Sequence, residues 1–263
     1  MRRRCIVHAR WLLAVAGVSC ATPAFAAPFL VQIEEVFVGT NGDPTAQAVQ
    51  IRLRTAGQNN LAGTRLCAVN ANGTGLLILA NFSNLPGPSV SGDRILVMTP
   101  SFANVTTPAA VADYTMLSIP QSYFAAGSLF FEDANTGVVY WRLSWGGSAY
   151  TGITTGASDN DDDPGFGNAE FGPPYPGALE LCRALRFQRG ATALSTSNAA
   201  DYVLTDMSPT FQKYQGATYQ VTGCVPIPAI TALGVVVMGV ALLACAGVII
   251  HRRRTNAGYP PRC

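Results

Sequence analysis

The sequence predicts an all-β protein, an antiparallel β-sandwich carried between an N-terminal signal peptide and one C-terminal transmembrane helix. Three observations predict this class. Apolar residues from position 29 onward recur with a period of two, which is the period of a half-buried strand. Clusters of Gly, Pro and Asn separate most strand candidates, as in sandwiches built from many short strands. Each end of the chain combines an apolar stretch with a cluster of arginines.

The N-terminus has the order of a secretory signal peptide, which we assign to residues 1–26. A charged segment and a short apolar core come first, followed by a small-residue cleavage site formed by Ala24, Ala26 and Ala27. The apolar core is too short to span a bilayer, so we expect cleavage after Ala26. Lipidation of Cys20, which follows small residues, remains an alternative, although the leucine usual three positions earlier is missing.

The remaining exported part forms one predicted domain, residues 27–223, that begins with two alternating strands. In the first strand, Phe29, Val31, Ile33 and Phe37 share one face; in the second, apolar Val49, Ile51 and Leu53 alternate with polar Gln50, Arg52 and Arg54. We expect both strands to be half-buried, with a solvated outer face. Further strands are predicted at 64–69, 75–79, 94–98, 128–131, 138–145, 181–188, 202–204 and 217–222.

One predicted strand is unusually aromatic. Val139, Trp141, Leu143 and Trp145 fall on a single face, opposite polar neighbours. Aromatic residues in an exported β domain can form a sugar-binding platform, but alternation with polar residues is typical of a core face. We therefore favour burial.

The order of these strands resembles the lamin-tail domain of bacterial exported proteins. The resemblance is carried by the segments 31–36, 49–53, 60–66, 91–97, 185–189 and 198–210, each a short motif. It implies an immunoglobulin-like β-sandwich used as a binding or structural module, and it implies no catalytic residues. The sequence departs from the family pattern at Arg52, where glutamate is usual, and in a long insertion at 150–179.

The C-terminal segment predicts a membrane-spanning helix at 229–250. These 22 uncharged residues would extend roughly 33 Å as a helix, enough to cross a hydrocarbon core. A linker at 224–228 precedes it, and the basic tail 251–263 is expected in the cytoplasm. The order of its parts is similar to Gram-negative sorting tails of the PEP-CTERM and IPTL-CTERM type, with the motif residues Pro226, Ile227, Pro228, Arg252, Arg253 and Arg254. That resemblance implies cleavage by an exosortase-type protease; a permanent anchor is the alternative.

Charge and histidine content exclude several functions. The exported part has nine basic and fifteen acidic residues, a net charge of −6, so we expect no nucleic-acid partner. The two histidines, His8 and His251, both lie in the terminal signals, which removes histidine-dependent nucleophilic mechanisms and histidine-ligated zinc from the exported part.

Paired carboxylates could still hydrolyse polysaccharide. Two adjacent pairs, Glu34 with Glu35 and Glu132 with Asp133, are better interpreted as surface charges pointing to opposite faces of their strands.

An acidic loop in the insertion suggests a calcium site. Asp159, Asp161 and Asp163 have the first, third and fifth positions of a calcium loop, and Glu170 has the twelfth. Against this interpretation, Pro164 stands where such loops need glycine. The alternative is a solvated acidic loop.

Three cysteines, Cys67, Cys182 and Cys224, lie in the exported part, and the sequence leaves their pairing open. Together these features predict a non-enzymatic cell-envelope or surface protein that meets the membrane and binds a surface polysaccharide or protein. A secreted carbohydrate-active hydrolase is the alternative.

Overall fold

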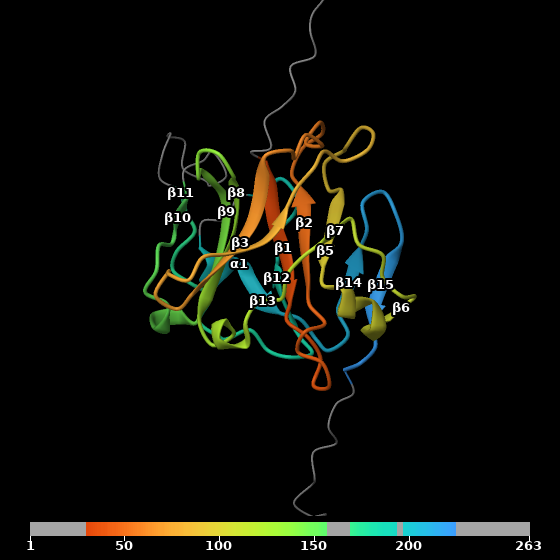
Figure 1. The fold of residues 1–263 in the computed structure, drawn as a ribbon. Helices are drawn as coiled ribbons and strands as arrows, with labels where there is room; N and C mark the ends of the chain where they lie inside the picture. Colours follow the sequence, from red (N-terminus) through yellow and green to blue (C-terminus); the bar gives the residue numbers. More distant parts are fainter. Residues whose placement is uncertain (1–29, 157–168, 194–196, 225–263) are drawn as a thin grey trace, which may run out of the picture.

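The computed structural model describes residues 30–156, 169–193 and 197–224 (Figure 1). Regular structure in these residues is mostly β-strand in antiparallel sheets, with one short α-helix and three short 3-10 helices, so the predicted all-β class is confirmed. The predicted signal peptide and transmembrane segment lie outside the described residues. Within the described ranges, no helix is long and apolar enough to cross a membrane.

A six-stranded sheet forms the centre of the molecule, in the order β13-β12-β1-β2-β5-β7. All neighbours pair antiparallel except the last, because the two-residue β7 runs parallel to β5. The strands are β1 (Val31–Phe37), β2 (Ala48–Leu53), β5 (Arg94–Met98), β7 (Tyr114–Thr115), β12 (Ala184–Phe187) and β13 (Tyr202–Leu204).

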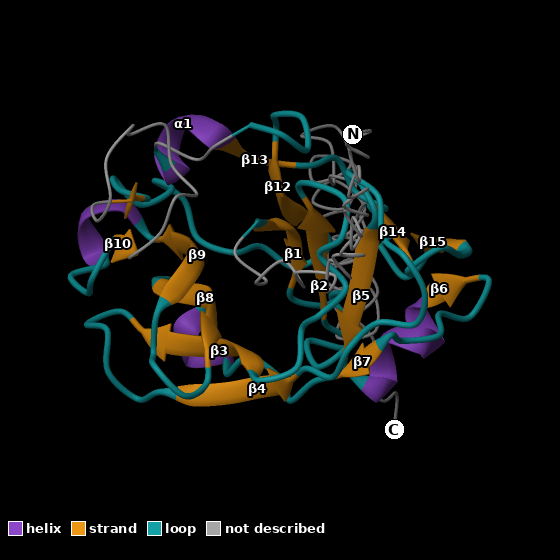
Figure 2. Cartoon of the chain, turned by 90° about the horizontal axis from the view of Figure 1, so that it is seen from above, coloured by secondary structure: helices purple, strands orange, loops and turns teal. Residues whose placement is uncertain are grey.

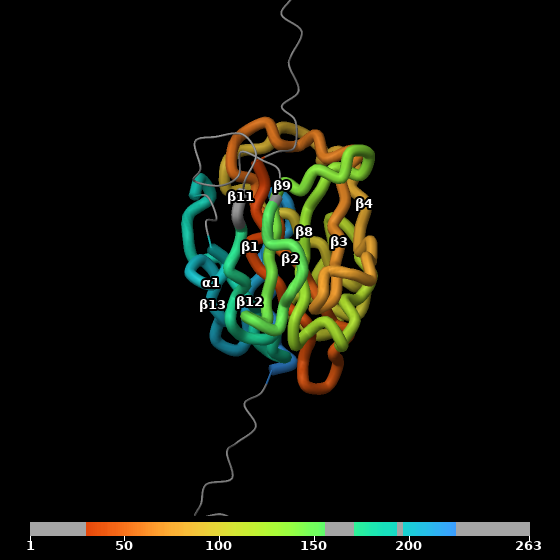
Figure 3. Tube along the Cα trace, turned by 90° about the vertical axis from the view of Figure 1, so that its left-hand side faces the viewer, coloured from red at the N-terminus to blue at the C-terminus, as the bar shows by residue number. Residues whose placement is uncertain are grey.

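A four-stranded antiparallel sheet covers one face of the central sheet (Figure 2). Its strands β9, β8, β3 and β4 follow one another across the view in Figure 3. The largest hydrophobic core lies between the two sheets, where Ile33 and Ile51 of the central sheet belong to the same cluster as Phe131 and Trp141 of the smaller one. The strands are β3 (Thr64–Asn70), β4 (Leu77–Asn81), β8 (Gly127–Asp133) and β9 (Val139–Trp145).

A three-stranded sheet packs on the opposite face of the central sheet, around a second core. Phe37, Phe102 and Phe211 meet there with ring centroids 5.2 to 6.2 Å apart. The strands are β14 (Thr210–Gln212), β15 (Thr218–Val221) and β6 (Thr106–Thr107). The other elements are the pair β10 (Thr155–Gly156) and β11 (Ala169–Glu170), the helix α1 (Asn198–Asp201), and the 3-10 helices η1 (Pro100–Val105), η2 (Gln121–Tyr123) and η3 (Gly147–Ala149).

A β-bulge in β1 changes which residues face the main core. Ile33 pairs with Ile51 and Glu35 pairs with Gln50, so Glu34 is an extra residue with no partner of its own. An extra residue shifts the alternation by one position. Val36 therefore joins the main core, whereas Phe37 joins the second core on the other face. The prediction that Phe37 shares a face with Val31 and Ile33 is wrong for this reason.

The solvated outer face predicted for β1 and β2 is also wrong. Every residue of both strands is buried, including the polar side chains of the outer face. The cause is the three-stranded sheet, which packs over that face together with the segment that follows β12. The residues that cover this outer face lie far away in the sequence. The alternating polar residues of β2 therefore form a buried polar layer and not a solvated surface.

A second bulge, between β8 and β9, divides the aromatic strand. Trp141, Leu143 and Trp145 are 0% exposed and lie in the main core, which confirms the predicted burial. Val139 is opposite Glu132, one step out of the regular pairing, and belongs to a small separate cluster with Phe130. The expectation that Val139 shares the face of the tryptophans is therefore wrong.

Candidate functional site

A polar cleft of about 310 Å³ lies between the outer face of the central sheet and the hairpin of β14 and β15. Strands β1, β2, β5 and β12 supply its floor, and the hairpin forms one wall. Its charged lining consists of two glutamates and four arginines, namely Glu34, Glu35, Arg52, Arg94, Arg186 and Arg189. The lining side chains are therefore more basic than acidic.

Glu34 is held by two arginines at once. Its Oε1 accepts hydrogen bonds from Nη1 of Arg52 at 2.9 Å and from Nη2 of Arg94 at 2.8 Å. Its Oε2 accepts a third from Nε of Arg94 at 2.6 Å. Glu34 is 5% exposed and Arg52 is 6% exposed, so this pair lies within the protein and not on its surface. Such charge-assisted bonds are strong, and they fix the carboxylate in one orientation.

Arg52 is the most enclosed arginine of the cleft. Its Nε donates to Oε1 of Gln32 at 2.7 Å, and its Nη2 donates to the carbonyl oxygen of Arg189 at 2.7 Å. The guanidinium lies over the ring of Phe187, 5.8 Å from its centroid. Burial lowers the pKa of Arg52, while the charge of Glu34 opposes that change. Arg52 thus ties β1, β2 and the segment after β12 together.

Glu35 is paired with a different arginine. Nη2 of Arg186 donates to Oε1 and Oε2 of Glu35, each at 2.9 Å, and Nε donates to Oε2 at 3.0 Å. Glu35 is only 2% exposed. Burial raises the pKa of Glu35 from its ordinary value of 4.5 to about 7, because the loss of water outweighs the opposing effect of Arg186.

The raised pKa predicts that stability depends on pH. A carboxyl group that is more readily protonated in the folded state stabilises the fold fully below pH 4.5, and this contribution is lost as the pH rises through about 7. We expect the free energy of unfolding to fall by on the order of 3 kcal/mol between pH 4.5 and 8, and the melting temperature to fall with it. The Glu35→Gln variant should lose that part of the pH dependence. An identical pH profile in the variant and the native protein would refute the assignment to Glu35.

The hairpin is attached to the cleft floor by glutamines. Nε2 of Gln50 donates to the carbonyl oxygen of Gln212 at 2.9 Å, and Oε1 of Gln50 accepts from the backbone N–H of Gln212 at 2.7 Å. Nη1 of Arg94 donates to Oε1 of Gln212 at 3.2 Å. The side chain of Gln50 therefore bonds to the backbone of β14 as a neighbouring strand would. These two hydrogen bonds explain why so short a strand lies against β2 and β5.

The acidic pairs singled out in the sequence do not behave as surface charges. The bulge brings Glu34 and Glu35 into the same cleft, contrary to the expectation that they point to opposite faces. Glu132 is 5% exposed and accepts a hydrogen bond from Nε of Arg65 at 2.7 Å. Only Asp133 is close to the prediction, since it is partly exposed and accepts backbone hydrogen bonds in the turn after β8.

Most other predicted site residues lie outside the described residues. These are the acidic loop residues Asp159, Asp161 and Asp163, the cleavage-site alanines, and the sorting-motif residues near 226 and 252. The backbone of Glu170 belongs to β11. Within the part of the chain that the structure describes, no group of three or more His, Cys, Asp or Glu side chains is placed to hold a metal ion.

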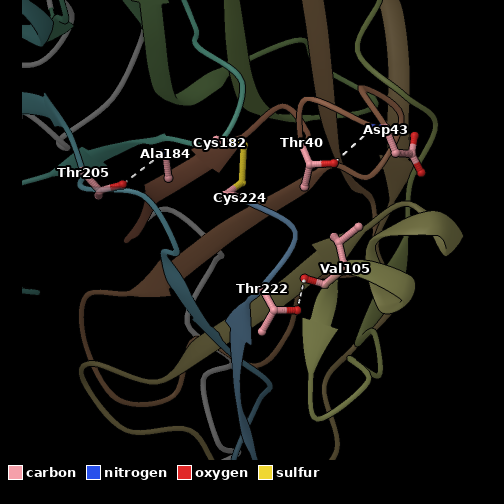
Figure 4. The surroundings of a disulfide bond; sticks show 8 residues. All are labelled: Thr40, Asp43, Val105, Cys182, Ala184, Thr205, Thr222 and Cys224. Atoms are coloured by element: carbon pink, nitrogen blue, oxygen red, sulfur yellow. Dashed lines mark hydrogen bonds between the residues drawn. A yellow bond between two sulfur atoms is a disulfide. The ribbon is translucent and has the colours of Figure 1, made fainter. Parts of the chain in front are cut away.

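Among the described cysteines, Cys182 and Cys224 form a disulfide (Figure 4). Cys182 precedes β12 of the central sheet and Cys224 follows β15, so the bond connects the central sheet to the three-stranded sheet. Thr222, two residues before Cys224, donates its N–H to the carbonyl oxygen of Val105 at 2.8 Å. Its side-chain hydroxyl donates to the same oxygen at 3.3 Å, which is the bond drawn in Figure 4. Of the three described cysteines, Cys67 is the one with a free thiol, and it is buried. Burial, with Glu132 nearby, raises the pKa of Cys67 to about 12. A thiol of that pKa is unreactive at neutral pH.

No family model, curated protein or solved structure matches this chain. The resemblances to lamin-tail domains and to sorting tails therefore stay predictions from short motifs. The class of protein that the described residues define is a mostly β domain of several antiparallel sheets, with a buried arginine–glutamate layer and one disulfide.

Proposed function

We propose that this chain is a non-enzymatic cell-envelope or surface protein whose lamin-tail-like, immunoglobulin-like β domain acts as a binding or structural module outside the cytoplasm. The observation that carries the proposal is the Cys182–Cys224 disulfide. Structural disulfides form and persist in oxidising compartments and are rare in the cytosol. This agrees with the export signal that residues 1–26 predict.

The alternative, a hydrolase with paired carboxylates, has less support. A glycosidase needs one carboxyl group that reaches the glycosidic oxygen and a second that reaches the anomeric carbon or a water. Both glutamates of the cleft are nearly inaccessible, and each is bound by arginine through at least two hydrogen bonds. The raised pKa of Glu35 would suit a general acid, but its carboxylate oxygens point to Arg186.

How the domain is retained forms the second part of the proposal. The apolar segment 229–250 either anchors the domain or directs it to an exosortase-type protease that cuts near residues 226–229. Cys224 is the first residue of the proposed linker, so the disulfide attaches the start of the linker to the domain. In either case the domain faces away from the cytoplasm, and the basic tail stays inside.

Mass spectrometry of the protein isolated from its native cells tests this proposal. We expect a mature N-terminus at Ala27, an intact disulfide, and a C-terminus either near residues 226–229 or at Cys263. The first C-terminus would indicate sorting and the second an anchor. An uncleaved N-terminus together with free thiols at Cys182 and Cys224 would refute export. A lipid on Cys20 would replace cleavage after Ala26 with lipoprotein processing.

A further inference from the structure

We propose that the cleft between β1, β12 and the β14–β15 hairpin binds a sugar acid, with its carboxylate on Arg186. This inference names a ligand class for the proposed binding module and rests on that function for its biological role. It is carried by the charge balance of the cleft, by one guanidinium edge that remains available, and by the polar groups around it.

Among the described residues, the charged lining of the cleft has more arginines than glutamates. Glu34 serves both Arg52 and Arg94, Glu35 serves Arg186, and Arg189 pairs with Asp201 at 2.8 Å. In the part of the chain that the structure describes, four guanidinium groups thus pair with three carboxyl groups. A lining of this charge favours an anionic ligand over a neutral one.

Arg186 offers the geometry to bind this anion. Its Nε and Nη2 are used by Glu35, but in the described part of the chain Nη1 has no hydrogen-bond partner. The side chain is 41% exposed, whereas Glu35 behind it is 3% exposed. A buried carboxylate therefore orients the guanidinium from one side, and the partly exposed side chain lines the cleft. A pre-oriented arginine can bind a carboxylate with little loss of side-chain entropy.

The rest of the lining suits hydroxyl groups better than an apolar ligand. Thr210 and Thr218 are exposed on the hairpin wall, and Gln188 is exposed on the opposite side. Hydroxyl and amide groups of this kind exchange hydrogen bonds with sugar hydroxyls. A volume of about 310 Å³ is near the lower limit of roughly 300–1,000 Å³ for small-molecule sites, so we expect one sugar residue and not a long chain segment.

The charged groups around Arg186 also predict how binding depends on pH. Glu35 and Glu34 approach from β1, Arg94 from β5 and Arg52 from β2. Arg189 follows β12, and its partner Asp201 ends α1. Among these groups, Glu35 competes most directly with a ligand for Arg186. Protonation of Glu35 removes that competition, so binding should strengthen as the pH falls from 8 to 6.

Isothermal titration of the full-length chain in detergent tests the proposal, with galacturonate, galactose 6-sulfate and galactose as probes. We expect galacturonate to bind and galactose to bind about tenfold more weakly or not at all. Stronger binding of galactose 6-sulfate would assign the site to a sulfated sugar and overturn the choice of carboxylate. Equal binding of galactose and galacturonate, or no heat from any probe at millimolar concentration, would overturn the proposal.

Two variants and one control locate the site. Arg186→Gln should weaken galacturonate binding about tenfold or more, whereas Glu35→Gln should strengthen it and reduce its pH dependence. Arg183→Gln is the matched control, because Arg183 is exposed to a similar extent, pairs with Glu180 and does not line the cleft. If Arg186→Gln does not fold, an unchanged affinity in Glu35→Gln would still contradict the proposal. If none of the sugars binds, the evidence for export is unaffected. If the protein proves to be cytoplasmic, the expected binding of galacturonate is unaffected.

Discussion

Replacing Cys182 and Cys224 by serine is expected to lower the free energy of unfolding by about 4 kcal/mol. The two cysteines are 42 positions apart, so the bond restricts a long loop of the unfolded chain. It also connects the loop before β12 to the end of β15, and both sulfur-bearing residues are buried. Chemical denaturation of the variant and the native chain measures the difference.

The control for this prediction is Cys67→Ala. Cys67 is buried and unbridged, so its substitution should cost only about 1 kcal/mol, and the variant should respond to a reducing agent as the native protein does. Addition of dithiothreitol should reproduce the loss seen in the double serine variant. If oxidised and reduced native protein melt at the same temperature, the disulfide contributes nothing to stability and the prediction fails.

Glu34→Ala is expected to destabilise the protein by about 3–5 kcal/mol. The change leaves Arg52, which is 6% exposed, without its carboxylate partner, and it removes the partner of Arg94 as well. An uncompensated buried charge is costly because the protein interior replaces water poorly. Equilibrium unfolding in urea measures the effect, provided that the variant and the native protein have the same dependence of the free energy of unfolding on urea concentration.

Two controls separate buried charge from general damage. Glu180→Ala removes a partner from an exposed pair with Arg183, and we expect a loss below about 0.5 kcal/mol. The double variant Glu34→Leu with Arg52→Met removes the buried pair as a whole, so it should be more stable than Glu34→Ala alone. If Glu34→Ala lowers the free energy of unfolding no more than Glu180→Ala does, the pair of Glu34 and Arg52 is not buried in solution.

The strands were predictable because their signal is local. Two strands, 94–98 and 202–204, have the predicted bounds, and several others differ by one to three residues. Period-two alternation reflects the geometry of the strand itself, so neighbouring residues are enough to detect it. Strand β14 was missed because it has three residues and only Phe211 is buried among them.

The bulges were not predictable, and the site depended on them. Glu34 fits a regular alternation in the sequence, and only its pairing with β2 shows that it is an extra residue. Its partners Arg52 and Arg94 are 18 and 60 positions away, and Arg186 is 151 positions from Glu35. The adjacent glutamates were a usable signal for the cleft, but the arginines that neutralise them could be matched to them only in three dimensions.

The amino-acid sequence by itself determined the all-β class, the burial of Trp141 and Trp145, and the positions of most strands, because each depends on short-range alternation of apolar and polar residues. The tertiary structure alone decided that Cys182 pairs with Cys224, that the polar faces of β1 and β2 are buried, and that Glu34 and Glu35 share one cleft. These features depend on contacts between segments distant in the chain. Packing of the whole domain determines such contacts, and no local pattern encodes them.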